Sequence, residues 1–206
     1  MEHTMKDPIT KSDAARSGLL ATVVLLVGLS FLFPSEARAD GWVSGFFGRA
    51  FGGETGVDLG EALKDRYLWT YGFNAGGMGG GVIGAEFDFG YTPNFFGSKG
   101  IVDKSGVMTV MGSLIAGIPV GGQSGAGIRP YGVFGVGLIR RRVEFSGALD
   151  NISSSDFGYN VGGGIMGFFN QTVGIRGEYR YFWAFTSSDE QDFKFSRASL
   201  GIVLRF

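Results

Sequence analysis

Residues 172–183 read Thr-Val-Gly-Ile-Arg-Gly-Glu-Tyr-Arg-Tyr-Phe-Trp, and this segment indicates the fold more clearly than any other part of the sequence. Every second position, from the valine onward, is apolar, aromatic or glycine. The positions between them include three charged residues, Arg176, Glu178 and Arg180. Successive side chains of a β-strand point to opposite faces, so the segment predicts a strand with one apolar and one charged face. Such a strand suits a wall between an apolar medium and a polar interior.

The same alternation recurs along the chain. At residues 82–91 the polar face carries Glu86 and Asp88, and in the last segment Arg197 lies on the face opposite Phe206. Eight segments of this type are predicted, at residues 42–53, 67–78, 81–92, 106–118, 129–143, 157–168, 172–185 and 194–206. Their lengths suit tilted membrane strands, which need about 9 to 11 residues to cross a bilayer. The inward or outward parity of the first, fourth and sixth segments stays open, because their two faces differ little in polarity.

The connections between these segments are of two kinds. Long polar connections at residues 54–66, 93–105, 145–156 and 186–193 alternate with shorter ones at 78–81, 119–128 and 169–171. Membrane barrels of bacteria show this asymmetry, with short turns on the periplasmic side and longer loops outside. The sequence therefore predicts an all-β fold, a transmembrane antiparallel up-and-down β-barrel of about eight strands.

A soluble β-sandwich is the alternative architecture, because its strands alternate as well. It would bury its apolar face, whereas here that face is rich in aromatic residues near the strand ends, as in the interfacial girdles of membrane barrels. The residues assigned to these girdles are Trp42, Trp69, Tyr71, Tyr91, Tyr179, Tyr181 and Trp183. The opposite face combines glycine with opposed charges, which favours the narrow lumen of a small barrel.

The N-terminal region is predicted to be a cleaved signal peptide. Basic residues precede an apolar stretch at residues 18–33, and Ala37 and Ala39 supply the small side chains of a signal-peptidase site. We therefore assign residues 1–39 to the signal peptide and residues 40–206 to the barrel domain. A membrane-spanning helix is the alternative, although a span needs about 20 apolar residues. The pattern predicts export through the general secretory route to the outer membrane of a Gram-negative bacterium.

Composition and charge argue against several function classes. The chain has 18 Lys and Arg against 19 Asp and Glu, so it lacks the positive excess that nucleic-acid binding requires. It has no cysteine, so no disulfide stabilises the exported fold. The only histidine is His3, in the predicted signal peptide, which leaves the barrel domain without an imidazole as general base. We expect no enzymatic activity, no metal site and no cofactor.

Four segments together carry a resemblance to a known family. They are Arg-Pro-Tyr-Gly-Val-Phe-Gly-Val-Gly at 129–137, Phe-Gly-Tyr-Asn-Val-Gly-Gly-Gly at 157–164, Arg-Gly-Glu-Tyr-Arg-Tyr-Phe at 176–182 and the terminal Phe206. Residues 40–206 resemble the small outer-membrane β-barrel family that includes the membrane domain of outer-membrane protein A and the opacity-type surface proteins. The resemblance implies the fold and an outer-membrane location, but it implies little about function.

Two features suggest partners. The C-terminal residues Ile202, Leu204 and Phe206 resemble the signature that the barrel-assembly machinery of this family reads, although Phe206 as a simple lipid anchor is the alternative. At the outer end of the fifth segment, alternation points Arg140 and Arg142 outward, where guanidinium groups bind the phosphates of lipopolysaccharide through paired hydrogen bonds. A solvated rim without lipid contact is the alternative there.

Seven charged residues are predicted to form an ion network inside the lumen. They are Arg49, Glu86, Asp88, Arg176, Glu178, Arg180 and Arg197. Unpaired charges are costly in a narrow interior, so we expect these residues to pair and close the lumen. The favoured function is a structural or surface-interaction barrel whose outer loops contact lipopolysaccharide, host or neighbouring molecules. A small channel for ions or small solutes is the alternative, and a lipid-modifying enzyme of the outer membrane is a weaker one.

Overall fold

The computed structural model describes residues 39–54, 68–95, 102–121, 125–145, 152–185 and 193–206. Most of the predicted signal peptide, including His3 and Ala37 of the cleavage site, lies outside the described residues. Ala39, the other residue of that site, is the first residue of the first strand. Among the described residues, no helix is long and apolar enough to cross a membrane.

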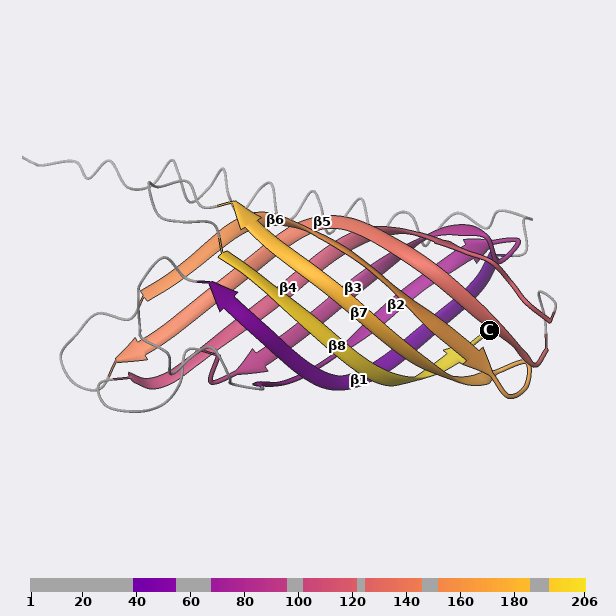
Figure 1. Ribbon diagram of the computed structural model, residues 1–206, viewed down its shortest axis with the longest axis horizontal. Coiled ribbons are helices and arrows are strands. Elements are labelled where there is room, and N and C mark those ends of the chain that lie inside the picture. Colours follow the sequence, from indigo (N-terminus) through magenta and orange to yellow (C-terminus); the bar gives the residue numbers. More distant parts are fainter. Residues whose placement is uncertain (1–38, 55–67, 96–101, 122–124, 146–151, 186–192) are drawn as a thin grey trace, which may run out of the picture. The chain divides into compact units, whose positions relative to one another are not determined.

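Eight antiparallel strands form one closed barrel (Figure 1). They are β1 (Ala39–Glu54), β2 (Leu68–Gly79), β3 (Ile83–Pro93), β4 (Val102–Gly117), β5 (Gly127–Phe145), β6 (Ile152–Phe168), β7 (Val173–Phe185) and β8 (Phe193–Arg205). Each strand pairs with the next in sequence, and β1 also pairs with β8, which closes the sheet. The predicted all-β, up-and-down architecture is therefore confirmed. In this order β1 and β5 stand on opposite walls, and so do β3 and β7.

β4 and β6 extend further toward the outer loops than the alternation of polarity predicted. β4 begins at Val102 rather than residue 106, and β6 begins at Ile152 rather than residue 157. Backbone pairing still joins Arg142 of β5 to Ser153 of β6. A ladder satisfies backbone N–H and C=O groups whether or not the side chains alternate in polarity, so it extends past the apolar part of the wall.

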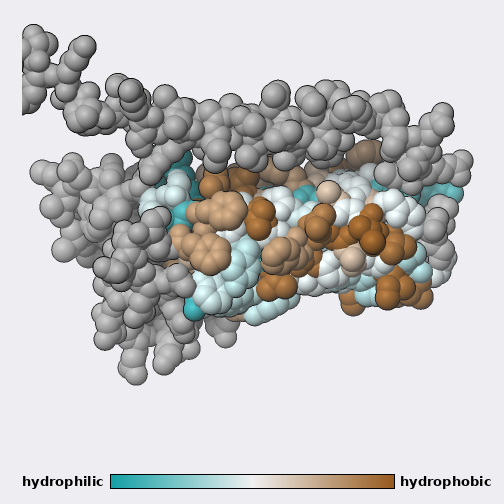
Figure 2. All heavy atoms as spheres, turned by 90° about the horizontal axis from the view of Figure 1, so that it is seen from above, coloured by the Kyte–Doolittle hydropathy of each residue, from teal (hydrophilic) through white to brown (hydrophobic). Residues whose placement is uncertain are grey.

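The outer wall of the barrel is apolar and aromatic. Large hydrophobic side chains from different strands stay exposed there, among them Phe47 at 53%, Leu114 at 68% and Leu200 at 73%. Figure 2 shows hydrophobic residues spread over the visible wall of the barrel. A water-soluble protein rarely exposes so extensive an apolar surface, because transferring such a surface out of water is favourable. The wall is therefore suited to a lipid environment.

One residue assigned to the aromatic girdle, Trp42, lies inside the barrel instead. Its side chain is 1% exposed and it pairs across the strands with Gly76, which leaves room for the indole. The even-numbered residues of β1 point inward, down to the fully buried Ala50. Both faces of β1 are apolar, so the pattern of polar and apolar residues does not indicate which face points inward. The prediction for Trp42 is therefore wrong.

The C-terminal residue completes the closure of the barrel through its backbone. The amide of Phe206 donates to the carbonyl of Gly41 at 2.9 Å, and the amide of Gly41 donates to the carbonyl of Phe206 at 3.1 Å. The Phe206 ring is 83% exposed, and Ile202 and Leu204 are exposed on the same face of β8. Closure therefore uses the backbone of Phe206, and its ring stays accessible from outside.

Replacing Phe206 with alanine should separate these two roles. The variant keeps both backbone hydrogen bonds, so its refolding yield in detergent should match that of the native chain. If assembly in the cell requires the C-terminal ring, the fraction inserted in the outer membrane should fall several-fold. Heat-dependent gel mobility measures both quantities, and Phe169→Ala, which truncates an exposed ring at the same end of the barrel, is the matched control. Equal losses in both assays would show that the ring is only a lipid anchor.

Candidate functional site in the lumen

The candidate site is a network of charged side chains that crosses the lumen between opposite walls. Glu86 on β3 faces two arginines on β7. Arg176 Nη1 lies 2.5 Å from Glu86 Oε2, and Arg180 Nη2 pairs with Glu86 Oε1. Both arginines also pair with Glu178, which stands between them on the same face of β7, and Arg180 Nε lies 2.6 Å from Glu178 Oε1. Each arginine thus bridges two carboxylates.

Asp88 and Arg197 extend the network to β8. Arg197 Nη2 lies 2.6 Å from Asp88 Oδ2, and the Asn74 amide donates to the same oxygen at 2.5 Å. Arg180 lies 3.9 Å from Asp88, and Arg197 lies 3.7 Å from Glu178, so the two halves are connected. The network balances three arginines with three carboxylates, and none of the six is more than 7% exposed.

Tyr131 on β5 is a member of this network that sequence reasoning missed. Its hydroxyl donates to Glu178 Oε2 at 2.7 Å and accepts a hydrogen bond from Arg176 Nε at 2.6 Å. The Arg176 guanidinium also lies 4.9 Å from the centre of the tyrosine ring. A signal was present in the sequence, because Tyr131 shares its face of the strand with Arg129 and with glycines, which is the polar and small pattern of a lumen face.

Glycines on β6 make room for these long side chains. Gly162 pairs across the strands with Arg180, and Gly164 pairs with Tyr131. A Cβ added at Gly162 would meet the Tyr179 carbonyl and the arginine side chain, and one added at Gly164 would meet the Gly177 carbonyl and the tyrosine side chain. The absence of side chains at these two positions of β6 therefore lets β5 and β7 fill the lumen.

Burial makes the network depend on its pairing. Moving a charge out of water costs several kcal/mol, and this cost is offset only where good partners surround the charge. Both oxygens of Glu86 are bound by arginines, and Asp88 is bound by Arg197 and Asn74. The arrangement is therefore a network of buried ion pairs. Among the described residues, no group of three or more His, Cys, Asp or Glu side chains is placed to hold a metal ion.

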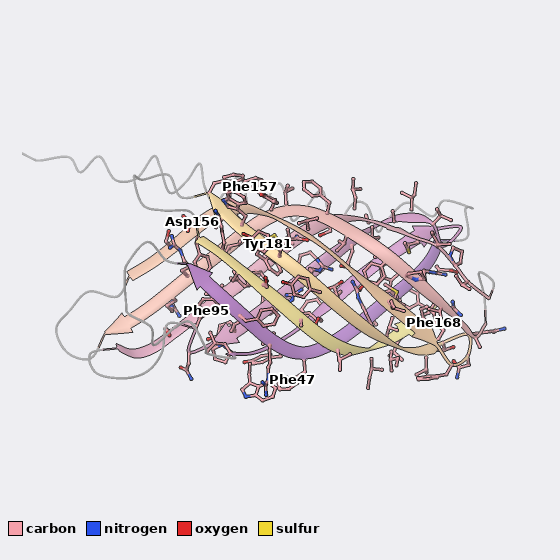
Figure 3. All side chains as sticks on the ribbon, viewed as in Figure 1. Phe47, Phe95, Asp156, Phe157, Phe168 and Tyr181 are labelled. Carbon is pink, nitrogen blue, oxygen red and sulfur yellow. The ribbon has the colours of Figure 1, made fainter. Side chains whose placement is uncertain are left out.

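Apolar layers lie on both sides of this charged layer. On β8 the buried residues run from Phe193 and Phe195 near the loops, through Arg197, to Val203 near the turns. The outer apolar layer comprises Ala50, Phe95, Val107, Met111, Ile139, Phe182, Ala184, Phe193 and Phe195. The turn-side apolar layer comprises Trp42, Met78, Ile115, Tyr131, Val133, Met166, Phe168 and Val203. Figure 3 shows Phe95 and Phe168 at opposite ends of the barrel.

Two arginines lie across the turn-side end of the lumen. Arg129 on β5 pairs with Asp40 on the opposite strand β1 at 3.1 Å. Arg205 on β8 donates to the backbone carbonyls of Gln171 and Gly125, each at 2.9 Å. These bonds tie the turn after β6 and the segment before β5 to the last strand. Side chains therefore cross the lumen at its turn-side mouth as well as in its three layers.

Three arginines at the outer end of the barrel are exposed on its outer face. Arg49 was predicted to join the lumen network, and this prediction is wrong: its side chain is exposed and its guanidinium lies 4.5 Å from the centre of the Trp69 ring. The even-numbered residues of β1 point into the lumen, so Arg49, at an odd-numbered position, points outward. Arg140 and Arg142 are exposed as well, while Arg141 between them turns inward and pairs with a carboxylate of β6 at 2.8 Å.

Replacing Arg180 with alanine should strongly destabilise the barrel. The change leaves the carboxylates of Glu86 and Glu178 short of a partner in a buried layer, so the free energy of unfolding should fall by roughly 3 to 5 kcal/mol. Urea unfolding in lipid bilayers, followed by tryptophan fluorescence, measures this loss. Arg140→Ala is the matched control, because an exposed charge contributes about 1 kcal/mol or less. Similar small losses in both variants would contradict a buried, coupled network.

Comparison with known proteins agrees with this architecture. Residues 21–206 match the family described as outer membrane protein beta-barrel domain. The chain is 33% identical over 190 residues to the 22 kDa outer membrane protein of Rhizobium leguminosarum bv. viciae, a match that covers 80% of this chain and 82% of that protein.

Solved structures show the same fold. The chain is similar to Neisserial surface protein A, with a TM-score of 0.63 and 15% identity over 81% of this chain and 97% of that one. It is also similar to Ail, the attachment invasion locus protein of Yersinia pestis, solved in complex with the heparin analogue sucrose octasulfate, with a TM-score of 0.53 and 18% identity over 82% of this chain and 99% of that one. Given the apolar outer wall, the closed eight-stranded sheet and these matches, the protein is located in the bacterial outer membrane, and the chain belongs to the outer membrane protein β-barrel domain family.

Proposed function

We propose that this protein is a non-enzymatic, non-conducting outer-membrane barrel with a structural or surface-interaction role. The observation that supports the proposal most directly is the filled lumen. A passing ion would have to separate buried ion pairs and then pass rings such as Phe182 and Phe195, whose centroids are 4.7 Å apart. An eight-stranded barrel leaves room inside for little more than side chains. A small channel, the alternative, needs a continuous hydrated path through all three layers.

The lumen also offers little to an enzyme mechanism. Small barrel enzymes that modify lipids need a general base, and His3 belongs to the predicted signal peptide. The carboxylates of the charged layer are held by arginines, so they are poorly placed to accept a substrate proton. We therefore propose that the barrel acts without chemistry and without a cofactor.

The outer loops are the proposed contact surface for a host or envelope partner, because loops on a rigid scaffold commonly carry binding function. Ail was solved with a sulfated ligand, a heparin analogue. In this chain, however, the connection at residues 186–192 carries Asp189, Glu190 and Asp192 and no lysine or arginine. Like charges repel, so we propose that this loop contacts a neutral or basic molecule rather than a polyanion.

Arg140 and Arg142 are proposed to contact lipopolysaccharide. Both side chains are exposed on the outer face near the outer end of β5, where their backbones pair with Ser155 and Ser153. A guanidinium presents two parallel N–H donors to a phosphate, and this charge-assisted geometry is stronger than a neutral hydrogen bond. Two such groups on one strand give the barrel an anchor for the phosphorylated lipid around it.

Planar-bilayer recording should find the native barrel silent. A variant with one truncation in each layer, Trp42→Ala, Arg180→Ala and Phe182→Ala, should show leak currents, because all three barriers to an ion are then lowered together. Heat-dependent gel mobility verifies that each protein is folded before recording. Steady, well-defined openings of the native protein would contradict the proposal and favour the small channel.

Replacing Arg140 and Arg142 with glutamine should lower the amount of lipopolysaccharide that stays bound through purification. Glutamine removes both positive charges and the paired donors for phosphate. Lysine at both positions keeps the charge but loses the paired geometry, so that variant should retain an intermediate amount. Lipopolysaccharide per barrel is measured by quantitative gel staining, and unchanged retention in the glutamine variant would refute this contact.

A further inference from the structure

Large apolar side chains are exposed at four corners of the turn-side end of the barrel. Val82 lies in the turn between β2 and β3, and Phe169 lies in the turn between β6 and β7. Between β4 and β5 the backbones of Val120 and Ile128 exchange hydrogen bonds of 2.8 and 2.9 Å, and Phe206 follows β8 at the end marked C in Figure 1. These five residues are called the turn-side rim.

The turn-side rim continues the outward rows of side chains on the wall. On β4 and directly after it, Leu114, Ala116, Ile118 and Val120 occupy alternate positions of the outer face, and all four are exposed. Val120 therefore extends, without a polar interruption, a row whose first members lie on the apolar wall. The turn-side rim is contiguous with the surface that faces lipid.

The length of this row matches the apolar band of a membrane barrel. Met108, near the other end of the row, pairs with Tyr91 of the aromatic girdle. From Met108 to Val120 the strand rises about 40 Å, which is about 30 Å along the barrel axis at a tilt of about 40°. The apolar band of outer-membrane barrels is about 25 Å tall. A barrel with its girdle at one boundary of the hydrocarbon thus has its turn-side rim at the other.

Charged side chains at this end point away from the turn-side rim. Within residues 112–121 and 125–134 the only charged residue is Arg129, which is buried and pairs with Asp40. Arg205, next to Phe206, is also buried and donates to the backbone carbonyl of Gln171. Long cationic side chains at a membrane surface normally extend toward water. Here they turn into the lumen, which leaves the outer side of this end apolar.

The backbone of the turn-side rim is also suited to hydrocarbon. The amide of Val82 donates within its turn at 3.2 Å, that of Phe169 donates across its turn at 3.0 Å, and that of Phe206 donates to β1 at 2.9 Å. Val120 and Ile128 satisfy each other. Hydrocarbon offers no hydrogen-bond partner, so an amide that enters it has to be paired within the protein. All five amides of the rim meet this condition.

We propose that the turn-side rim inserts into the acyl chains of the phospholipid leaflet at this end of the barrel. The barrel then ends level with the membrane surface, and the exposed polar tip of the turn at Gln171 lies among the headgroups and water. Moving the five apolar side chains from water into hydrocarbon is favourable. The rim thereby fixes the depth of the barrel at its turn-side end, as the aromatic girdle does at its loop end.

A single protein partner fits this arrangement poorly. The corners of the rim lie at the turns β2–β3, β4–β5 and β6–β7 and at the end of β8, so they are spread around the whole closed sheet. Their side chains point outward from different walls. A protein docked beside the barrel would cover one or two corners, whereas lipid surrounds all four.

Site-specific fluorescence in lipid nanodiscs tests this placement. The chain has no cysteine, so Val120→Cys and Phe169→Cys each provide a single attachment point for an environment-sensitive fluorophore. Gln171→Cys, in the same turn as Phe169, is the matched control, and Leu114→Cys on the wall is the reference for hydrocarbon. Discs of dimyristoyl phosphatidylcholine with one barrel each are open on both faces, so iodide reaches any label in water. Nitroxide groups on the acyl chains quench labels in the hydrocarbon.

We expect acyl-chain nitroxides to quench the labels at positions 120 and 169 several-fold more strongly than the label at 171, as they do at 114. Iodide should show the opposite order. Heat-dependent gel mobility verifies that each labelled barrel is folded. Labels at 120 and 169 that iodide quenches as strongly as the label at 171 would overturn the proposal. Protection from iodide that appears only in discs with two barrels would overturn it as well, because the rim would then contact a second copy.

Discussion

A chain that crosses hydrocarbon must pair its backbone N–H and C=O groups within the protein, and the ladder between β1 and β8 meets this requirement by closing the sheet. The paired backbones of Gly41 and Phe206 complete that ladder at the turn-side end. Closure at eight strands creates a narrow lumen that side chains have to fill. The charged layer, the two apolar layers and the glycines that make room for them all follow from this constraint.

Within that lumen the charged layer contributes specificity more than stability. A buried ion network commonly stabilises a fold no better than well-packed apolar residues do, because desolvation offsets the attraction between the charges. A slip of β7 by one residue, however, would turn Arg176, Glu178 and Arg180 toward lipid. The cost of that arrangement is large in hydrocarbon, so the network selects one register of the barrel. The apolar layers on either side then keep water away from the paired charges.

Glycines serve different purposes on the two faces of the wall. Gly162 and Gly164 face the lumen, and the side chains that occupy their space, Arg180 and Tyr131, belong to the barrel itself. Gly45 faces the outer side of β1, where a Cβ added to it would meet no atom of the described residues within 4 Å. The two faces of the wall therefore meet different surroundings, the packed side chains of the lumen and the lipid outside.

The alternation in β3, β7 and β8 by itself determined the fold class and the faces of Glu86, Arg176 and Arg197, because lipid on one side and a lumen on the other demand opposite polarity at successive residues. β1 lacks that contrast, so its pattern predicted the wrong face of the wall for both Trp42 and Arg49. Pairing with β2 and β8 decided its parity, since the indole requires the space opposite Gly76.

Contacts across the lumen were decided by tertiary structure alone. The Tyr131 hydroxyl meets a carboxylate 47 residues away in sequence, and Arg197 pairs with Asp88, 109 residues away. A local pattern reports which face a side chain takes. Which side chains then meet depends on how the closed sheet is staggered and curved, and those properties arise only when the first strand pairs with the last.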